Sequence, residues 1–176
     1  MTFDTIQQAT RDHRNAHGCG AYTFEDGPGL TALAAEAGAS RALELGTALG
    51  YTACCIAAAG PAVMVDTVEL DPVHVRLGRE NIAAAGLSDR ISVHEGDFEA
   101  VMAGFAPGYD FAFFDGFAPA VTLIGRIRDL LVPGGMLACA NLQMAKCDLA
   151  QELGDSRRWR PADAIEGGKT RAFIKQ

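Results

Sequence analysis

Several carboxylates of this 176-residue sequence lie at or near the ends of short apolar runs, where they could bind a ligand or accept a proton. One of them, Glu44, lies in the run Ala42 to Leu45, directly before a turn that contains Gly46 and Gly50. A glycine turn lets ligand atoms approach the backbone where a side chain would clash. A carboxylate beside such a turn repels phosphate and attracts a cationic amine. The pattern therefore favours a nucleoside that carries an ammonium group.

A second carboxylate, Glu69, lies near the end of the apolar stretch Ala62 to Leu70. It follows Gly46 at about the 20-residue spacing at which an acid binds a ribose diol, because one carboxylate can accept hydrogen bonds from both hydroxyls. The N-cap of the following helix is better filled by Asp71, which directly precedes Pro72. We therefore expect Glu69 to bind a ribose, and its neighbour Leu70 to belong to the same ligand site.

Two further acids follow apolar runs. Asp97 comes after the alternating run Arg90 to Glu95, and Asp115 comes directly after the aromatic run Tyr109 to Phe114. A run of the second kind is typical of a central strand that is covered on both faces. Asp97 also suits the N-cap of a following helix, and this interpretation is compatible with ligand binding.

The elements that must position these acids alternate between strand and helix from Ala42 onward, which predicts an α/β fold with a doubly wound, mostly parallel sheet and an antiparallel C-terminal hairpin at one edge. A Pro-Gly turn over Val132 to Gly135 should end one helix and start the fifth strand. The expected helices are 2–14, 29–37, 51–59, 72–85, 118–131 and 146–153, and the expected strands are 42–45, 62–70, 90–95, 109–114, 136–141, 157–160 and 170–174.

Length and composition set limits on the domain count and on the class of protein. The chain is predicted to hold one domain, residues 28–176, preceded by a helix and loop, residues 1–27, that act as a lid or docking segment. With 49% hydrophobic and 21% charged residues the composition is that of a globular protein. No apolar run is long enough to span a membrane, and five cysteines without disulfide or zinc spacing indicate reduced thiols in the cytoplasm.

The net charge of −7 argues against nucleic acid as a partner, because such binding depends on clustered lysine and arginine. One basic segment, Arg157 to Arg160, surrounds Trp159 and could stack on a base or bind a carboxylate. A solvated edge strand with one packed aromatic side chain is the interpretation we favour. A homodimer through the N-terminal helix or the edge hairpin is a further expectation.

The segment Glu44 to Thr52, ELGTALGYT, resembles motif I of class I S-adenosylmethionine-dependent methyltransferases, in particular the small-molecule O-methyltransferases that act on catechols and caffeoyl-CoA. Three later segments resemble the same family in the same order. They are Gly96-Asp97-Phe98, Asp115-Gly116 and Leu131 to Leu137, LVPGGML. The resemblance implies a Rossmann-like methyltransferase fold, S-adenosylmethionine as the cofactor and a small molecule as the methyl acceptor.

The resemblance also implies a role for each matching residue. Asp115 would lie between the methionine end of the cofactor and the acceptor, with Asn141 on the acceptor side. His17, in the loop that follows the first expected helix, is a candidate base because a histidine can take a proton near neutral pH. Glu69 would hold the ribose, and Asp97 and Phe98 would lie beside the adenine. The methionine end would be lined by Glu44, Gly46, Thr47, Gly50 and Thr52.

The sequence departs from the metal-dependent members of that family at two positions. Ala140 stands in place of the second metal-binding aspartate, and Ala118 stands in place of a lysine. Because a hard divalent cation needs several oxygen ligands, we expect no metal at this site. Deprotonation of a phenol then depends on His17, on Asp115 or on an acceptor that is already nucleophilic.

Two other functions remain open at this point. The altered positions are compatible with a catalytically inactive protein that binds S-adenosylmethionine in a regulatory or assembly role. A nicotinamide-dependent oxidoreductase is less consistent with the sequence, because the third glycine of the dinucleotide fingerprint is absent and Glu44 would repel a pyrophosphate.

Overall fold

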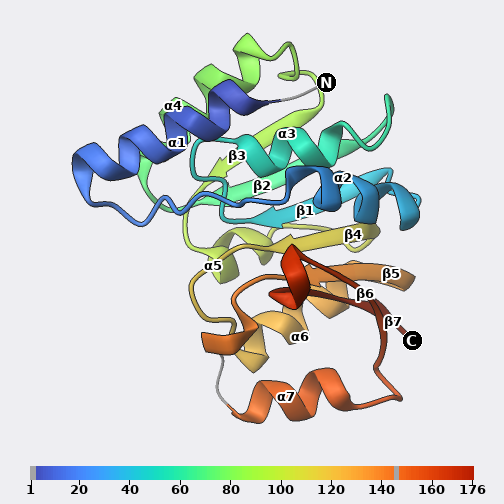
Figure 1. The fold of residues 1–176 in the computed structure, drawn as a ribbon. Coiled ribbons are helices and arrows are strands. Elements are labelled where there is room, and N and C mark those ends of the chain that lie inside the picture. Colours follow the sequence, from blue (N-terminus) through green and yellow to red (C-terminus); the bar gives the residue numbers. More distant parts are fainter. Residues whose placement is uncertain (1–2, 145–146) are drawn as a thin grey trace.

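The computed structural model of the chain describes residues 3–144 and 147–176 (Figure 1). Two 3₁₀ turns, η1 (Leu142–Met144) and η2 (Glu166–Gly168), accompany the helices and strands. In chain order these are α1 (Asp4–His17), α2 (Gly27–Glu36), β1 (Arg41–Leu45), α3 (Tyr51–Ala57), β2 (Met64–Glu69), α4 (Pro72–Ala84), β3 (Ile91–Glu95), α5 (Phe98–Met102), β4 (Tyr109–Phe114), α6 (Val121–Leu130), β5 (Leu131–Cys139), α7 (Cys147–Gly154), β6 (Trp159–Ile165) and β7 (Thr170–Lys175).

All strands belong to one seven-stranded sheet with the order β3-β2-β1-β4-β5-β7-β6. Strands β1 to β5 run parallel, whereas β7 is antiparallel to both β5 and β6. The predicted α/β fold with an antiparallel C-terminal hairpin is therefore confirmed. The strand order reverses between β1 and β4, and in open parallel sheets ligands bind at this switch point beyond the carboxyl ends of the strands.

Helices cover both faces of the sheet, and a separate apolar core fills each interface (Figure 1). On one face α2, α3 and α4 pack through side chains such as Leu30, Ile56 and Ile82. On the other face α5, α6 and α7 pack through Met102, Ile124 and others. The aromatic run of β4 serves both cores, because alternate side chains of a strand point to opposite faces.

The structure corrects several of the expected boundaries, among them the end of α1 at His17 and the span of β6, Trp159–Ile165. Helix α6 begins at Val121 rather than at Ala118. The residues between Leu131 and Met136 form a bulge inside β5, because Leu131 pairs with Tyr109 and Met136 already pairs with Phe111. Strand β5 ends at Cys139, so that Asn141 lies beyond it in a left-handed conformation with a φ angle of 59°. The predicted start of the first helix, Thr2, and that of the last helix, Lys146, lie outside the described residues.

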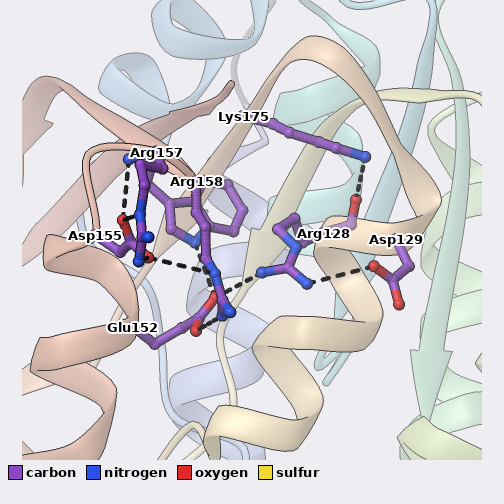
Figure 2. A network of polar contacts seen from close by, with 8 residues as sticks. Arg128, Asp129, Glu152, Asp155, Arg157, Arg158 and Lys175 are labelled. Carbon is purple, nitrogen blue, oxygen red and sulfur yellow. Dashed lines mark hydrogen bonds and ion pairs between the residues drawn. The ribbon is translucent and has the colours of Figure 1, made fainter.

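The basic segment around Trp159 is a packed edge of the sheet, as our preferred interpretation predicted. The indole is buried, and Figure 2 shows the neighbouring guanidinium groups directed at carboxylates of the chain itself. Arg158 pairs with Glu152 and Asp155, and Arg157 pairs with Asp155 through Nη2 at 2.9 Å. These contacts account for the arginines at positions 157 and 158 without a ligand.

The helices of the described part of the chain offer no membrane span, because none of them combines the necessary length with sufficient apolar character.

Candidate functional site

The chain segments that leave β1 and β4 lie side by side at the switch point of the sheet. The Asp115 N–H donates to the carbonyl of Leu45 at 2.9 Å, and the Gly46 N–H donates to the carbonyl of Val68 at 3.0 Å. These bonds extend the parallel pairing by one residue beyond each strand. Gly46, Glu69 and Asp115, which the sequence predicted as site residues, therefore lie together at the carboxyl ends of the parallel strands.

The turn after β1 has the backbone that its glycines permit. Gly46 has a φ angle of 108°, and a Cβ atom at this position would lie 3.3 Å from the backbone of Asp115. Gly50 has a φ angle of 92° and immediately precedes α3. Residues with a side chain rarely adopt these φ angles, so the glycines allow the turn to lie close against the strand beside it.

The carboxylate of Glu44 is fully buried beneath this turn. Thr67 donates a hydrogen bond to its Oε2 atom at 2.5 Å, and the hydroxyls of Thr67 and Thr47 are 2.6 Å apart. The Oε1 atom is buried and has no hydrogen-bond partner among the described residues. Desolvation, reinforced by the charge of Glu69, raises the pKa of Glu44 to about 7. Glu44 thus supports the turn from below, with its carboxylate fully buried.

Replacing Glu44 with glutamine is expected to change how stability depends on pH. The unfolded chain loses this proton near pH 4.5 and the folded chain near pH 7, so ionisation of Glu44 lowers stability as the pH rises through this window. The shift corresponds to about 3 kcal/mol. Between pH 4 and pH 8 the unfolding free energy of the variant, relative to the natural protein, should therefore rise by about that amount in urea titrations. A difference independent of pH would contradict the assignment.

The carboxylate of Glu69 binds the backbone around the cleft. Its Oε2 atom accepts from the N–H of Ala48 at 2.9 Å, and its Oε1 atom accepts from the N–H groups of Leu70 and Asp71 at 2.9 and 3.0 Å. A carboxylate offers about four lone-pair positions, so one remains for a ligand. Glu69 therefore links the turn after β1 to the turn after β2.

Asp115 is the acid at the end of β4. Desolvation raises its pKa well above the ordinary value, and the charges of Glu44 and Glu166 act in the same direction. Asn141 lies next to this turn, and its side-chain amide donates to the carbonyl of Gly116 at 2.9 Å. The structure therefore brings Asp115 and Asn141 together, as expected, but gives Asn141 a backbone partner.

A narrow cleft, with a volume of about 10 Å³, lies between the turn after β1 and the segment that follows α1. The side chain of Gln7 donates to the carbonyl of Phe24 at 2.9 Å, and the Arg14 guanidinium lies 3.9 Å from the centre of the Tyr22 ring. Helix α1 thus holds this segment over the cleft. The cleft is lined by Thr10, Tyr22, Thr23, Phe24, Thr47, Ala48, Leu49, Tyr51, Thr52 and Asp115.

The remaining predicted site residues lie around the cleft or away from it. Asp97 caps α5 by accepting from the N–H groups of Glu99 and Ala100, so its N-cap interpretation is confirmed. Leu70 is exposed, and the Phe98 ring packs edge-on against that of Phe114. His17 does not lie in the predicted loop. It is the exposed last residue of α1 and is absent from the cleft lining.

Several contributors to this site carried no recognised signal in the sequence. Thr67 belongs to β2, where polar residues stand among apolar ones. This pattern could have indicated that the Thr67 side chain faces the turn after β1, in which it contacts Thr47. Thr10 reaches the cleft from α1. Glu166 approaches from the hairpin between β6 and β7, and its N–H donates to Asp26 at 3.2 Å. No local pattern reveals contacts between residues 140 positions apart.

Comparison with curated proteins finds relatives over parts of the chain. The O-methyltransferase imqG of Aspergillus flavus is 48% identical over 56 residues, which are 32% of this chain and 23% of that protein. The catechol O-methyltransferase of Mycobacterium tuberculosis is 35% identical over 97 residues, which are 54% of this chain and 44% of that protein. The matches thus cover less than half the length of either relative.

Solved structures share the fold across nearly the whole chain. The O-methyltransferase of Bacillus cereus, solved in complex with SAH, superposes with a TM-score of 0.80 and 18% identity, covering 98% of this chain and 91% of that one. At that identity the likeness shows the fold. Residues 43–142 match a family described as a methyltransferase domain. Because this match spans β1 to the end of β5 and more than half of the chain, the protein belongs to that methyltransferase family.

Proposed function

We propose that the protein transfers a methyl group from S-adenosylmethionine to an oxygen atom of a small molecule, without a metal at Asp115. The observation that supports this most directly is the placement of Asp115 against the glycine turn after β1, in a cleft covered by the segment around Tyr22. An acid beside a turn shaped for a ligand suits the approach of an acceptor hydroxyl. Family membership supplies the reaction class.

The residues present fit S-adenosylmethionine. Gly46, at a φ angle of 108°, lets the turn lie against Asp115, and Glu44 beneath the turn keeps a buried oxygen without a partner among the described residues, which adds negative potential. In our proposal Thr47 and Thr52 lie at the methionine end, with Gly46 and Gly50. The lone-pair position left on Glu69 accepts from the ribose, and Asp97, Phe98 and Leu70 form the adenine end.

The protein's part in the reaction is to orient the acceptor and to take its proton. S-adenosylmethionine, when bound, supplies an electrophilic methyl group. Asp115 accepts the proton of the acceptor hydroxyl, and its raised pKa makes its ionised form a stronger base than an exposed carboxylate. Asn141 holds the Asp115-Gly116 turn in place through the Gly116 carbonyl. The segment from Tyr22 to Phe24 excludes water from the cleft.

The absence of a metal at Asp115 is also part of the proposal. A hard cation needs several oxygen ligands, whereas the position before Asn141 is Ala140. Within the described ranges, Asp115 does not belong to any group of three His, Cys, Asp or Glu side chains that could hold an ion. Proton transfer to Asp115 therefore replaces Lewis-acid activation.

The experiment that tests this function combines calorimetry with a transfer assay. S-adenosylmethionine and NADH are titrated separately into the protein, and labelled S-adenosylmethionine is then incubated with a panel of catechols and other phenols. We expect binding of S-adenosylmethionine and labelled product at a rate that added Mg²⁺ does not raise. Binding without transfer to any acceptor would indicate an inactive binding protein. Binding of NADH alone would indicate an oxidoreductase.

Replacing Asp115 with asparagine is expected to lower the turnover number by about 100-fold, the loss typical of a missing general base. The cofactor affinity should change little, because asparagine keeps the shape of the side chain. The dependence of the rate on pH is the decisive measurement. The low-pH limb, which reports protonation of Asp115, should vanish in the variant. An unchanged pH profile would contradict a role for Asp115 as the base.

Further proposals concern the setting of the reaction. We propose that residues 1–27 act as a lid, since α1 holds the segment over the cleft through Gln7 and Arg14. The acceptor is a small molecule rather than a nucleic acid, in keeping with the net charge of −7. We place the protein in the cytoplasm, where the free thiols of Cys19, Cys54, Cys55 and Cys139 would stay reduced.

A further inference from the structure

Three potential metal ligands from separate parts of the chain meet beside the cleft. His13 belongs to α1, Cys19 follows α1 after the left-handed residue Gly18, and His74 lies in the first turn of α4. One ligand atom from each of the three side chains lies within 4.8 Å of the other two. The rings of His13 and His74 meet edge to face with their centres 5.3 Å apart. The contact joins α1 to α4, which lie near each other in Figure 1.

His74 carries the observation that points to a ligand. Its side chain is 5% exposed, and its Nε2 atom is buried without a hydrogen-bond partner among the described residues. Buried polar atoms are almost always paired, so an unpaired one needs an explanation. The other ring nitrogen, Nδ1, lies 3.8 Å from Oε1 of Glu69. A metal-binding histidine commonly directs its second nitrogen at a carboxylate, which fixes the ring and leaves the first nitrogen free for the ion.

From this geometry we infer a binding site for Zn²⁺ or a cation of similar softness, formed by His13, Cys19 and His74 with a water molecule in the fourth position. Two imidazoles and a thiolate are ligands that zinc prefers, and Mg²⁺ and Ca²⁺ prefer oxygen. The site is separate from Asp115 and Asn141. Its ion would tie the end of α1 and the following loop to the start of α4.

The arrangement needs only small movements to accept the ion. With zinc–nitrogen bonds of about 2.0 Å and zinc–sulfur bonds of about 2.3 Å, tetrahedral ligands lie about 3.3–3.6 Å apart. His13 and Cys19 are partly exposed, and Cys19 lies in a loop, so both can approach the buried His74. The nearby carboxylates of Glu69 and Asp71 supply negative charge. Asp71 accepts from the N–H of Val73 and that of His74 itself, which places its carboxylate beside the site.

The test is a calorimetric titration of Zn²⁺ into the metal-stripped protein, with a phosphine reductant because dithiols compete for zinc. We expect one ion per chain and a rise in the melting temperature on binding. Cys19→Ser and His13→Ala should each lower the affinity at least about 100-fold, more than the loss of an outer-shell partner causes. Both side chains are partly exposed, so these variants should fold. Cobalt in place of zinc should show a thiolate charge-transfer band that Cys19→Ser abolishes.

His94→Ala is the matched control. His94 is bonded to Asp66 at 2.8 Å and is not part of the cluster, so its loss should leave zinc affinity within about twofold. The inference is wrong if the natural protein binds no stoichiometric zinc. It is also wrong if Cys19→Ser and His13→Ala bind zinc as tightly as the natural protein does. These readouts do not depend on methyl transfer, so they stand apart from the proposed function.

Discussion

Replacing Glu69 with alanine is expected to weaken S-adenosylmethionine binding by about 10³-fold. In our proposal the carboxylate accepts one hydrogen bond from the ribose through its remaining lone-pair position, and a bond to a charged acceptor is worth about 1.5–3 kcal/mol. The same carboxylate receives the N–H of Ala48 and the N–H of Leu70, so its loss also loosens two turns around the cleft. The lost ribose bond and the loosened turns together are expected to cost about 4 kcal/mol of binding free energy, which corresponds to that change in affinity. Calorimetric titration of S-adenosylmethionine into the natural protein and into the variant measures the change in affinity.

Glu80→Ala is the control for this prediction. Glu80 lies on α4 and pairs with Arg76 on the exposed surface, where an ion pair is worth little. Its loss should leave cofactor affinity unchanged. Circular dichroism of the Glu69 variant must show an intact fold. If the folded variant then binds S-adenosylmethionine as tightly as the natural protein does, Glu69 is not the ribose ligand.

Replacing Glu152 with alanine is expected to destabilise the protein by about 4 kcal/mol, because it removes charge-assisted hydrogen bonds to two arginines and leaves the buried Trp159 indole N–H without its acceptor. The Glu152 side chain lies at the centre of the network in Figure 2 and is nearly buried. Its Oε1 atom accepts from Arg128 at 2.9 Å and from the Trp159 indole at 3.4 Å, and its Oε2 atom accepts from Arg158. Urea denaturation of the natural protein and the variant measures the difference.

Asp129→Ala provides the comparison within the same network. Asp129 contacts Arg128 at 3.6 Å, but its side chain is 71% exposed. Exposed pairs contribute roughly 0–1 kcal/mol. An equal loss of stability in both variants would show that burial of Glu152 is not what makes its contacts strong. A loss under about 1 kcal/mol for Glu152→Ala would contradict the prediction outright.

Local patterns were sufficient for the order of the strands and of the helices other than α5. Alternating apolar runs and glycine turns predicted the strands and the doubly wound sheet, because hydrophobic periodicity and turn chemistry act over a few residues. The N-cap role of Asp97 was accessible for the same reason, since its partners Glu99 and Ala100 follow immediately. The match to a methyltransferase family likewise rests on a continuous stretch, residues 43–142.

Long-range contacts were not accessible in this way. The sequence predicted that Glu44 faces a ligand ammonium, whereas the fold buries its carboxylate under the turn and bonds it to Thr67. His17 was expected in a loop at the acceptor, but α1 continues through it. Helix ends depend on caps and packing as much as on composition. Here Gly18, in a left-handed conformation directly after His17, ends the helix.

By itself the sequence determined the fold class, the family and the carboxylates at the strand ends, because these follow from periodicity and from motifs within single segments. Tertiary structure decided which of those carboxylates stay accessible and which are buried. It also decided that His13, Cys19 and His74 meet, and that the Glu166 N–H donates to Asp26. Such meetings depend on how helices and hairpins pack across the sheet, and packing brings together residues whose separation in the chain leaves no local trace.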